Sequence, residues 1–289
     1  MQPRRLSILG VGLLGGSIGL AVRATSSSCR IIGYGHRKET LDRAVQMGAI
    51  DEPVTDAAAA VEGADLVILC TPVGLFADIL SRIAPALKPG SIVTDVGSTK
   101  RSVVKLAEQR LPRGVHFVGS HPMAGSEKRG AEFARADLFK GATCIVTPTD
   151  ATDAGAIEQV EAFWQLLGMR LIRLSPDEHD RLAAQVSHVP HAVAAALVAM
   201  QSDAALRLAG RGFLDATRIA SGDGGLWRDI LLDNQDHVRD GVRKLVGELE
   251  QLLERLEKKD GEAVRQWLDA SAAQRERLVR QKLEEMNPD

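Results

Sequence analysis

Near its start the chain reads Leu6-Ser7-Ile8-Leu9-Gly10-Val11-Gly12-Leu13-Leu14-Gly15. The first four residues are typical of a short buried strand, and the glycines that follow have G-x-G-x-x-G spacing ahead of a helical pattern. Glycines at these positions permit a tight turn, close approach of the main chain to a phosphate, and close helix–strand packing. Unpaired N–H groups at the helix start attract anions. The stretch predicts a dinucleotide site made by Gly10, Gly12, Leu13, Leu14 and Gly15; the alternative is a purely structural turn.

Beyond this stretch, short apolar runs alternate with segments of helical spacing over the first ~175 residues. The runs are 6–9, 30–35, 66–70, 91–95, 115–118, 142–146 and 169–174. The helical segments include 38–47, 76–87, 102–110 and 156–167. Such alternation is typical of a parallel sheet covered by helices on both faces. We therefore expect an α/β Rossmann-type doubly wound sheet over residues 1–175.

The pattern changes after residue 174. Ser175-Pro176-Asp177-Glu178 has a capping serine, a proline at the first helical position and acids in the first turn, which predicts a helix start. The rest is helix-rich, and the alanine-rich stretch 189–208 suggests a helix buried on several sides. Leu245, Leu249, Leu252 and Leu256 form an amphipathic stripe, which fits either packing inside the domain or a dimer interface. We expect an all-α domain over residues 176–289 that also dimerises.

Composition restricts the class of partner. A formal net charge of -2 gives no support for binding nucleic acid or an anionic membrane. No run reaches the ~20 uninterrupted apolar residues of a membrane span, and the start of the chain does not resemble a signal peptide. Cys29, Cys70 and Cys144 are far apart and lie in or beside apolar runs, so we expect small buried side chains, no metal site and a cytoplasmic location.

The end of the second predicted strand bears on the choice of cofactor. An NAD site usually has an acid there, which binds the ribose 2′-hydroxyl. This chain instead has His36, Arg37 and Lys38. An arginine fork and a lysine suit a 2′-phosphate, so NADP is favoured over NAD, although a solvated basic turn would look the same. Thr71 and Pro72, at the end of another strand, are further predicted neighbours of the cofactor.

Two polar, glycine-containing stretches follow predicted strands. They are Asp95-Val96-Gly97-Ser98-Thr99-Lys100 and Gly119-Ser120-His121-Pro122-Met123-Ala124-Gly125-Ser126-Glu127. A histidine after a strand is often structural. His121, however, lies among small residues at the sheet edge where ligands bind, and its ordinary pKa suits a general base.

The helical half contributes its own candidates. Ser187 and His191 are four apart and would share one face of a helix. Arg218 lies in a mostly apolar helical stretch ahead of Trp227. Such an arginine either pairs with an internal acid or binds a carboxylate ligand, and the residues alone do not decide between these.

Taken together, these motifs resemble those of the prephenate and arogenate dehydrogenases, over nearly the whole chain. The string His121-Pro122-Met123-Ala124-Gly125-Ser126-Glu127 is the most specific part. The resemblance implies a two-domain enzyme of tyrosine biosynthesis that pairs as a homodimer through its helical domain. It implies oxidative decarboxylation of prephenate to 4-hydroxyphenylpyruvate, with NAD+ or NADP+ as hydride acceptor. The related substrate arogenate would give tyrosine.

The resemblance also implies roles for single residues. His121 would take the proton of the substrate hydroxyl, and Ser98 would orient that hydroxyl or His121. Arg218 would bind a substrate carboxylate. Further pocket residues implied in the same way are Ser126, Glu127, Ser187, His191 and Trp227.

The chain also departs from relatives of this kind. Gly222-Asp223-Gly224-Gly225 replaces a Ser-Asp-Pro stretch, which predicts a looser loop before Trp227. No chorismate mutase segment or regulatory domain is recognised, so we expect a monofunctional enzyme. A β-hydroxyacid dehydrogenase would need a lysine in the helical half, and none occurs between residues 174 and 243. A non-catalytic dinucleotide sensor would need neither His121 nor Arg218.

Overall fold

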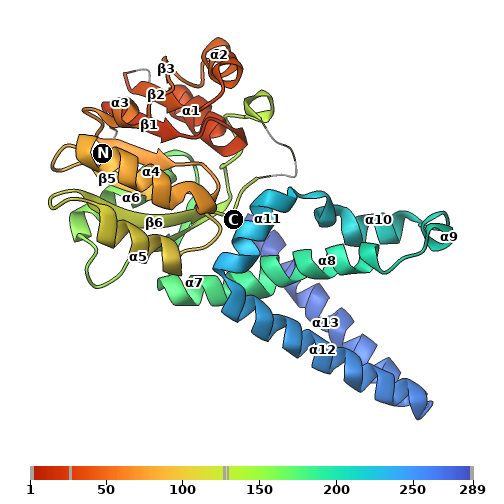
Figure 1. Cartoon of the computed structure of the whole chain (residues 1–289). Helices are drawn as coiled ribbons and strands as arrows, with labels where there is room; N and C mark the ends of the chain where they lie inside the picture. Colours follow the sequence, from red (N-terminus) through yellow and green to blue (C-terminus); the bar gives the residue numbers. More distant parts are fainter. Residues whose placement is uncertain (1–2, 26–27, 126–127, 129, 287–289) are drawn as a thin grey trace. The chain divides into compact units, whose positions relative to one another are not determined.

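The computed structural model describes residues 3–25, 28–125, 128 and 130–286. The chain divides into two compact units, Met1–Gln235 and Asp236–Asp289. The first unit holds an eight-stranded sheet in the order β3-β2-β1-β4-β5-β6-β7-β8 (Figure 1). Its strands are Arg5–Leu9 (β1), Arg30–Tyr34 (β2), Glu52–Val54 (β3), Leu66–Leu69 (β4), Ile92–Asp95 (β5), His116–Pro122 (β6), Thr143–Thr147 (β7) and Arg170–Arg173 (β8).

Helices separate most of these strands, as the alternating pattern predicts. They are α1 (Leu13–Thr25), α2 (Lys38–Gln46), α3 (Ala57–Val61), α4 (Phe76–Ile83), α5 (Arg101–Arg110) and α6 (Ala154–Leu166), with short 3-10 turns η1 (Val73–Leu75), η2 (Ala84–Ala86) and η3 (Ala131–Phe133). Asp56 and Asp153 cap α3 and α6 by accepting main-chain N–H bonds of 2.8 Å. Such caps satisfy N–H groups that the first helical turn leaves unpaired.

Side chains alternate between the two faces of the sheet and so supply two cores. Leu6 and Ile8 belong to one core, together with Phe163 and Trp164 of α6. Leu9 belongs to the other core, which residues of α3, α4 and α5 complete. The strands are buried on both faces and therefore read as continuous apolar runs. The expected doubly wound fold is confirmed, with two differences.

The first difference is that the sheet is mixed. Strand β7 runs antiparallel to β6, although β8 is again parallel to β7. A parallel neighbour needs a crossover connection, usually a helix. The described residues between β6 and β7 contain only the short turn η3, so the chain returns in the opposite direction. The second difference is the edge strand β3, which the apolar pattern missed because its three residues, Glu52-Pro53-Val54, include no apolar run.

After β8 the chain is helical. The elements are α7 (Pro176–Ala183), a π-helical turn η4 (Ala184–His188), α8 (Val189–Ala199), α9 (Asp203–Leu206), α10 (Arg211–Thr217), a 3-10 turn η5 (Arg218–Ser221) and α11 (Gly224–Asp233). The predicted helix start is confirmed, because Ser175 accepts the N–H of Glu178 at 3.2 Å. Helices α7 and α11 pack on α5 and η1 respectively. This packing explains why the first compact unit extends to Gln235, beyond the domain boundary predicted near residue 175.

The alanine-rich helix is shorter and less buried than expected. Helix α8 ends at Ala199, and Leu197, Val198 and Met200 are exposed. The stretch Pro176–Ala199 meets the length and composition criteria for a membrane span, with a mean hydropathy of 1.4 over its most apolar window. Helices of a globular core meet the same criteria. Because this stretch also carries His179, Asp180 and His188, which are buried and hydrogen-bonded within the chain, it has the character of a core helix with one uncovered face.

The second unit consists of most of α12 (Gln235–Glu257) and of α13 (Gly261–Met286). Leu249 and Leu256 of the predicted stripe are exposed, as are Leu253 of α12 and Leu268, Leu278 and Leu283 of α13. Packing inside the chain therefore leaves much of the apolar surface of these helices uncovered.

Candidate active site

The glycine loop lies at the carboxyl edge of β1. Gly10 has a φ of +109°, and its N–H donates to the carbonyl of Tyr34 at 2.9 Å, which ties the loop to the end of β2. A Cβ on Gly15 would lie 2.1 Å from the carbonyl oxygen of Gly10, so that glycine is needed for close packing. A Cβ on Gly12 would meet nothing within 4 Å. Gly12 thus borders open space at a helix N-terminus, which is what a pyrophosphate requires.

The loop after β4 closes the other side of the open space beside Gly12. The glycine loop and the loop after β4 together form what we call the glycine cradle. A Cβ on Gly10 would lie 2.8 Å from the carbonyl group of Cys70, so the two loops touch. The hydroxyl oxygen of Thr71 is buried without a hydrogen-bond partner among the described residues. A buried polar atom of this kind calls for a ligand or water. Together, the space beside Gly12 and the hydroxyl of Thr71 fit a bound dinucleotide, and Leu13 and Leu14 begin the helix beneath it.

The loop 95–100 is held by a buried ion pair. The carboxylate of Asp95, at the end of β5, accepts bonds from Nζ of Lys100, from the N–H of Gly97 at 2.8 Å and from the N–H of Ser120 at 3.0 Å. Nζ of Lys100 also donates to the carbonyl of Thr99 at 2.8 Å. Asp95 and Lys100 are fully buried. Their pairing folds the loop back on itself and presents Ser98, which is partly exposed.

Strand β6 carries the candidate base. It continues to Pro122, so His121 lies within the strand. The apolar pattern had instead predicted that the strand ends before His121. The hydroxyl of Ser120 contacts the carbonyl of Asp95 at 2.5 Å, Oγ1 of Thr94 at 2.8 Å and Nε1 of Trp164 at 3.1 Å. These bonds fix the main chain immediately before His121.

His121 is bonded to a residue of the helical part. Its Nδ1 lies 2.8 Å from Nε2 of His179 on α7, and Nδ1 of His179 lies 2.8 Å from Oδ1 of Asp180. The same carboxylate accepts the N–H groups of Lys100 and Arg101 at 2.7 and 2.9 Å, which begin helix α5. Among the described residues, Nε2 of His121 has no hydrogen-bond partner.

These histidines are held neutral. Burial lowers the pKa of His121 well below 6.5, and electrostatic interactions with His179, Lys100 and His188 lower it further. Burial also lowers the pKa of His179, although the hydrogen bond with Asp180 opposes it. A neutral His121 with a bare ring nitrogen can accept a proton.

His188 extends the cluster toward Ser98. Its Nδ1 accepts a bond from Nδ2 of Asn234 at 3.1 Å, and the same amide donates to the carbonyl of Asp180 at 2.7 Å. Burial lowers the pKa of His188 to about 4, although the charge of Asp180 opposes this shift. Ser98 lies in the loop 95–100, which Asp95 ties to the strand that carries His121.

Other predicted residues gather around Trp227. His191 stacks on its indole ring, with centroids 3.5 Å apart, and Nδ1 of His191 is buried without a partner among the described residues. A Cβ on Gly222 would lie 2.4 Å from Nε1 of Trp227. The loop before Trp227 is therefore closely packed at Gly222, and Asp223 caps α11 through the N–H of Leu226, although a Cβ on Gly224 would meet nothing within 4 Å.

Three further predicted residues lie in or beside the short helical turns η4, η5 and η1. Ser187 lies in the π-helical turn η4, a feature that often marks functional sites. Arg218 is exposed at the start of η5, which packs against α8. Pro72 begins η1, where a Cβ on Gly74 would meet Asp229 of α11.

The remaining predicted residues either lie on the surface after β2 or fall outside the described part of the chain. His36, Arg37 and Lys38 are exposed between β2 and α2. Ser126 and Glu127 lie outside the described residues.

Sequence reasoning missed His179, Asp180 and Asn234. Helix α7 buries His179, Asp180 and Ala183. A signal for this was present, because residues 176–183 contain too few apolar residues to make a buried face without polar ones.

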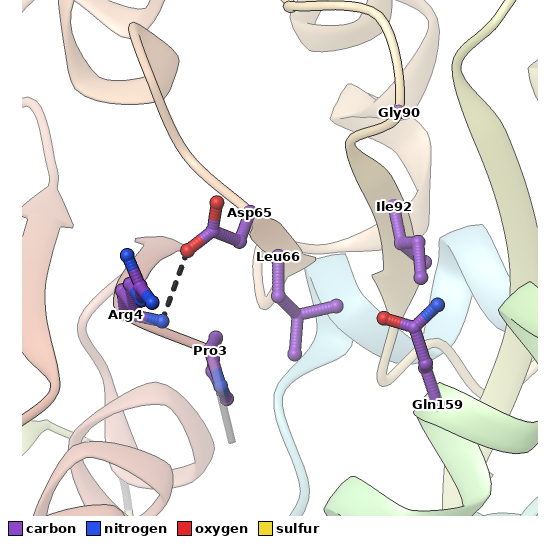
Figure 2. A pocket seen from close by; sticks show the side chains of 7 residues that line it. All are labelled: Pro3, Arg4, Asp65, Leu66, Gly90, Ile92 and Gln159. Atoms are coloured by element: carbon purple, nitrogen blue, oxygen red, sulfur yellow. Dashed lines mark hydrogen bonds between the residues drawn. The ribbon is translucent and has the colours of Figure 1, made fainter. Parts of the chain in front are cut away.

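A cavity of about 530 Å³ lies at the opposite, amino edge of the sheet. Figure 2 shows its lining residues, including Arg4, Asp65 and Gln159. The carboxylate of Asp65 is already bonded to the N–H groups of Arg4 and Arg5 and to Lys88. This cavity is remote from the glycine loop and holds none of the predicted site residues.

The glycine cradle and the neutral histidine at the carboxyl edge of one sheet define a class of enzyme, the dinucleotide-dependent dehydrogenases. Sequence models of two domains place the chain more closely. "Prephenate dehydrogenase, nucleotide-binding domain" matches residues 18–173, and "Prephenate dehydrogenase, dimerization domain" matches residues 175–270. The chain belongs to the prephenate dehydrogenase family.

Individual relatives agree. The chain is 37% identical to prephenate dehydrogenase of Bacillus subtilis, over 95% of this chain and 76% of the relative. It is 34% identical to cyclohexadienyl dehydrogenase of Zymomonas mobilis, over 90% of each. The structure of prephenate dehydrogenase from Aquifex aeolicus, in complex with hydroxyphenyl propionate and NAD+, superposes with a TM-score of 0.90 at 33% identity, covering 96% of this chain and 99% of that one.

The role of Gly12 can be separated from that of a packing glycine. Gly12→Ala should leave stability unchanged but weaken binding of a reduced nicotinamide dinucleotide by about tenfold or more, because the methyl group would occupy the cradle. Gly19→Ala is the contrast, since its Cβ would lie 1.9 Å from the carbonyl oxygen of Ala49. It should lower the free energy of unfolding by about 1–3 kcal/mol. Calorimetric titration and urea denaturation measure the two effects; unchanged affinity in Gly12→Ala would contradict the cradle.

The buried histidines predict acid sensitivity. In the folded state the pKa values of His121, His179, His188 and His191 are all lowered from 6.5. The unfolded chain therefore binds more protons below that pH, so the stabilisation is complete above pH ~6.5 and declines as the pH falls. His188 alone should account for about 3 kcal/mol between pH 6.5 and about 4. Urea denaturation at several pH values tests this, with His188→Gln expected to flatten the dependence. Constant stability from pH 7 to 5 would contradict it.

Proposed function

We propose that the chain catalyses oxidative decarboxylation of prephenate to 4-hydroxyphenylpyruvate in tyrosine biosynthesis. The observation that carries the proposal is the neutral His121, with Nε2 unpartnered among the described residues, on the same sheet edge as the glycine cradle. Family membership and relatives named prephenate dehydrogenase support it.

His121 is the proposed general base. Prephenate carries a ring hydroxyl, a ring carboxylate and a pyruvyl side chain. A dinucleotide held by Gly10, Gly12 and Thr71 would supply the acceptor for the hydride that leaves the carbon bearing the hydroxyl. Nε2 of His121 takes the hydroxyl proton, and loss of the ring carboxylate as CO2 then makes the ring aromatic. General-base help of this kind accelerates reactions by about 10²–10⁴.

The remaining proposed contacts hold the substrate. Ser98 orients the hydroxyl or His121, which is supported by its place in the loop that Asp95 ties to β6. Arg218 binds a substrate carboxylate, a charge-assisted contact that its exposed position on η5 permits. Ser187, His191 and Trp227 complete the pocket from the helical side. His191 is the best supported of these three, because its buried Nδ1 has no partner in the described part of the chain.

Two alternatives receive less support. Arogenate would undergo the same chemistry, but the most similar relatives named above include two prephenate dehydrogenases. A dinucleotide sensor would have no use for the buried chain of His121, His179 and Asp180.

We further infer that NADP is preferred over NAD. Arg37 occupies the N-cap position of α2, and its side chain makes no capping hydrogen bond. It is exposed just after the end of β2, and no acid is present at that position. The bond from Gly10 to Tyr34 keeps this position next to the glycine loop. The Aquifex aeolicus structure contains NAD+, so this preference would be a property of the present chain.

A homodimer that forms through the helical region is also proposed. The second matching domain is described as a dimerization domain. Support comes from the uncovered apolar side chains of α8 and its neighbours, among them Leu208 with 86% exposure. A second copy would cover such a surface. The location expected for this biosynthetic enzyme is the cytoplasm.

The catalytic role of His121 predicts a specific kinetic effect. His121→Asn should lower kcat with prephenate by about 10²-fold or more, because an amide cannot accept the proton, while dinucleotide affinity stays unchanged. The assay follows reduced nicotinamide with prephenate and with arogenate, each against NAD+ and NADP+. His116→Asn, at the other end of β6, is the matched control and should keep full activity. Near-normal turnover in His121→Asn would refute the base assignment.

The cofactor preference predicts a selective effect at Arg37. Arg37→Ala should weaken NADP binding by about tenfold or more through loss of a charge-assisted bond, and should leave NAD binding unchanged. Arg43→Ala, also exposed on α2, serves as the control for a general loss of positive charge. Equal effects of Arg37→Ala on both cofactors would show that the 2′-phosphate is not bound there.

A further inference from the structure

The carboxylate of Asp180 can only accept hydrogen bonds. Two of its three partners are the main-chain N–H groups of Lys100 and Arg101, which are donors in every protonation state. Burial would raise the pKa of Asp180, but the hydrogen bonds from His179 and from these N–H groups outweigh it and lower the pKa below 3.8. Asp180 is therefore an anion, and Nδ1 of His179, at 2.8 Å from Oδ1, must carry a proton.

This assignment determines the next ring in the chain. A neutral histidine protonated on Nδ1 has a bare Nε2, which accepts a bond. The only described partner of Nε2 of His179 is Nδ1 of His121 at 2.8 Å, so that nitrogen must be the donor. In His121 the bare nitrogen is then Nε2, the atom that has no partner among the described residues.

We propose that His179 and Asp180 are positioning residues that fix His121 in the tautomer with a bare Nε2. The proposal rests on the base role proposed above for His121. When Nε2 takes the substrate proton, an O–H bond breaks and an N–H bond forms. Nδ1–H of His121 keeps His179 as its acceptor, and the charge of Asp180 stabilises the cation that results. His179, which is bonded to both residues, couples the carboxylate of Asp180 to the ring of His121.

The same carboxylate also positions the loop of Ser98. Helix α5 receives no cap from its own N-cap side chain, Lys100. Asp180 replaces that cap from another helix by binding the first two N–H groups. The amide of Asn234 in turn holds the carbonyl of Asp180. One residue thus sets the tautomer of the base and the place of the loop beside it.

The tautomer itself is measurable without turnover. In long-range ¹H–¹⁵N spectra of the enzyme with bound dinucleotide, the His121 ring should show a protonated Nδ1 and a bare Nε2. The chain has seven histidines, and the His121→Asn variant identifies the signal. A His121 ring protonated on Nε2 would overturn the proposal whether or not His121 is the base.

Kinetics test the consequence. In Asp180→Asn the amide oxygen can keep the bonds of Oδ1 with Lys100 and His179, but the negative charge that stabilises the protonated His121 is lost and the NH2 group faces the N–H of Arg101. We expect kcat to fall by about 10²–10⁴-fold, with KM and dinucleotide affinity within about threefold of the unchanged enzyme. Asp177→Asn is the control, since it removes an exposed carboxylate from the same helical turn. Full turnover in Asp180→Asn would refute the proposal if His121→Asn is inactive. Full turnover in His121→Asn would refute the base role instead.

A second pair of variants leaves the cap of α5 intact. His179→Gln offers Nδ1–H of His121 an amide oxygen as acceptor, whereas His179→Leu offers none. The glutamine variant should retain at least about tenfold more turnover than the leucine variant. Equal losses in two folded variants would show that His179 only fills space, and would overturn the proposal even if Asp180→Asn did not fold.

Discussion

The buried ion pair between Asp95 and Lys100 is the constraint on which the site depends. Removing both charges from water is costly, and their attraction offsets this cost only if the remaining donors and acceptors are also satisfied. Here the carboxylate also binds the N–H groups of Gly97 and Ser120, and the ammonium binds the carbonyl of Thr99. The pair thereby joins the loop that carries Ser98 to the strand that carries His121, and it places a positive charge that helps keep His121 neutral.

The helical part attaches to this framework by polar contacts between buried groups. Asp180 binds the start of α5 and His179, and Asn234 binds the main chain of Asp180 and the ring of His188. Each of these bonds depends on orientation, whereas apolar contact would tolerate sliding. The proposed base and the proposed cofactor site come from different elements and need well-defined positions, because a misplacement of about 1 Å can cost about 10²-fold in rate.

The sequence predicted the fold well because its strongest signals are local. Because the central strands are buried on both faces, each reads as an apolar run. The G-x-G-x-x-G spacing by itself predicts the glycine cradle. Strand β3 and the reversal of β7 escaped prediction, since the three residues of β3 form no apolar run and the direction of β7 depends on the absence of a crossover helix among the described residues between β6 and β7. Among the candidate site residues, His121 was predicted from a string typical of a family. His179 and Asp180 were missed because their partners lie 58 and 80 residues away, and only the fold brings such residues together.

The topology explains why these groups meet at one place. The strand order reverses between β1 and β4, where successive connections leave to opposite sides and open a crevice at the carboxyl edge. Gly10 and Cys70 end the two strands that flank this point and touch each other. The loop after β5 and the end of β6 lie on the same edge, one and two strands further along. The antiparallel turn into β7 then lets β6 continue two residues past Ser120, and this extension is what brings His121 within reach of α7. The parallel pairing of β6 with β5 ends at Val118, and the antiparallel pairing with β7 continues to Pro122. The departure from the predicted topology is therefore part of how the proposed base is placed.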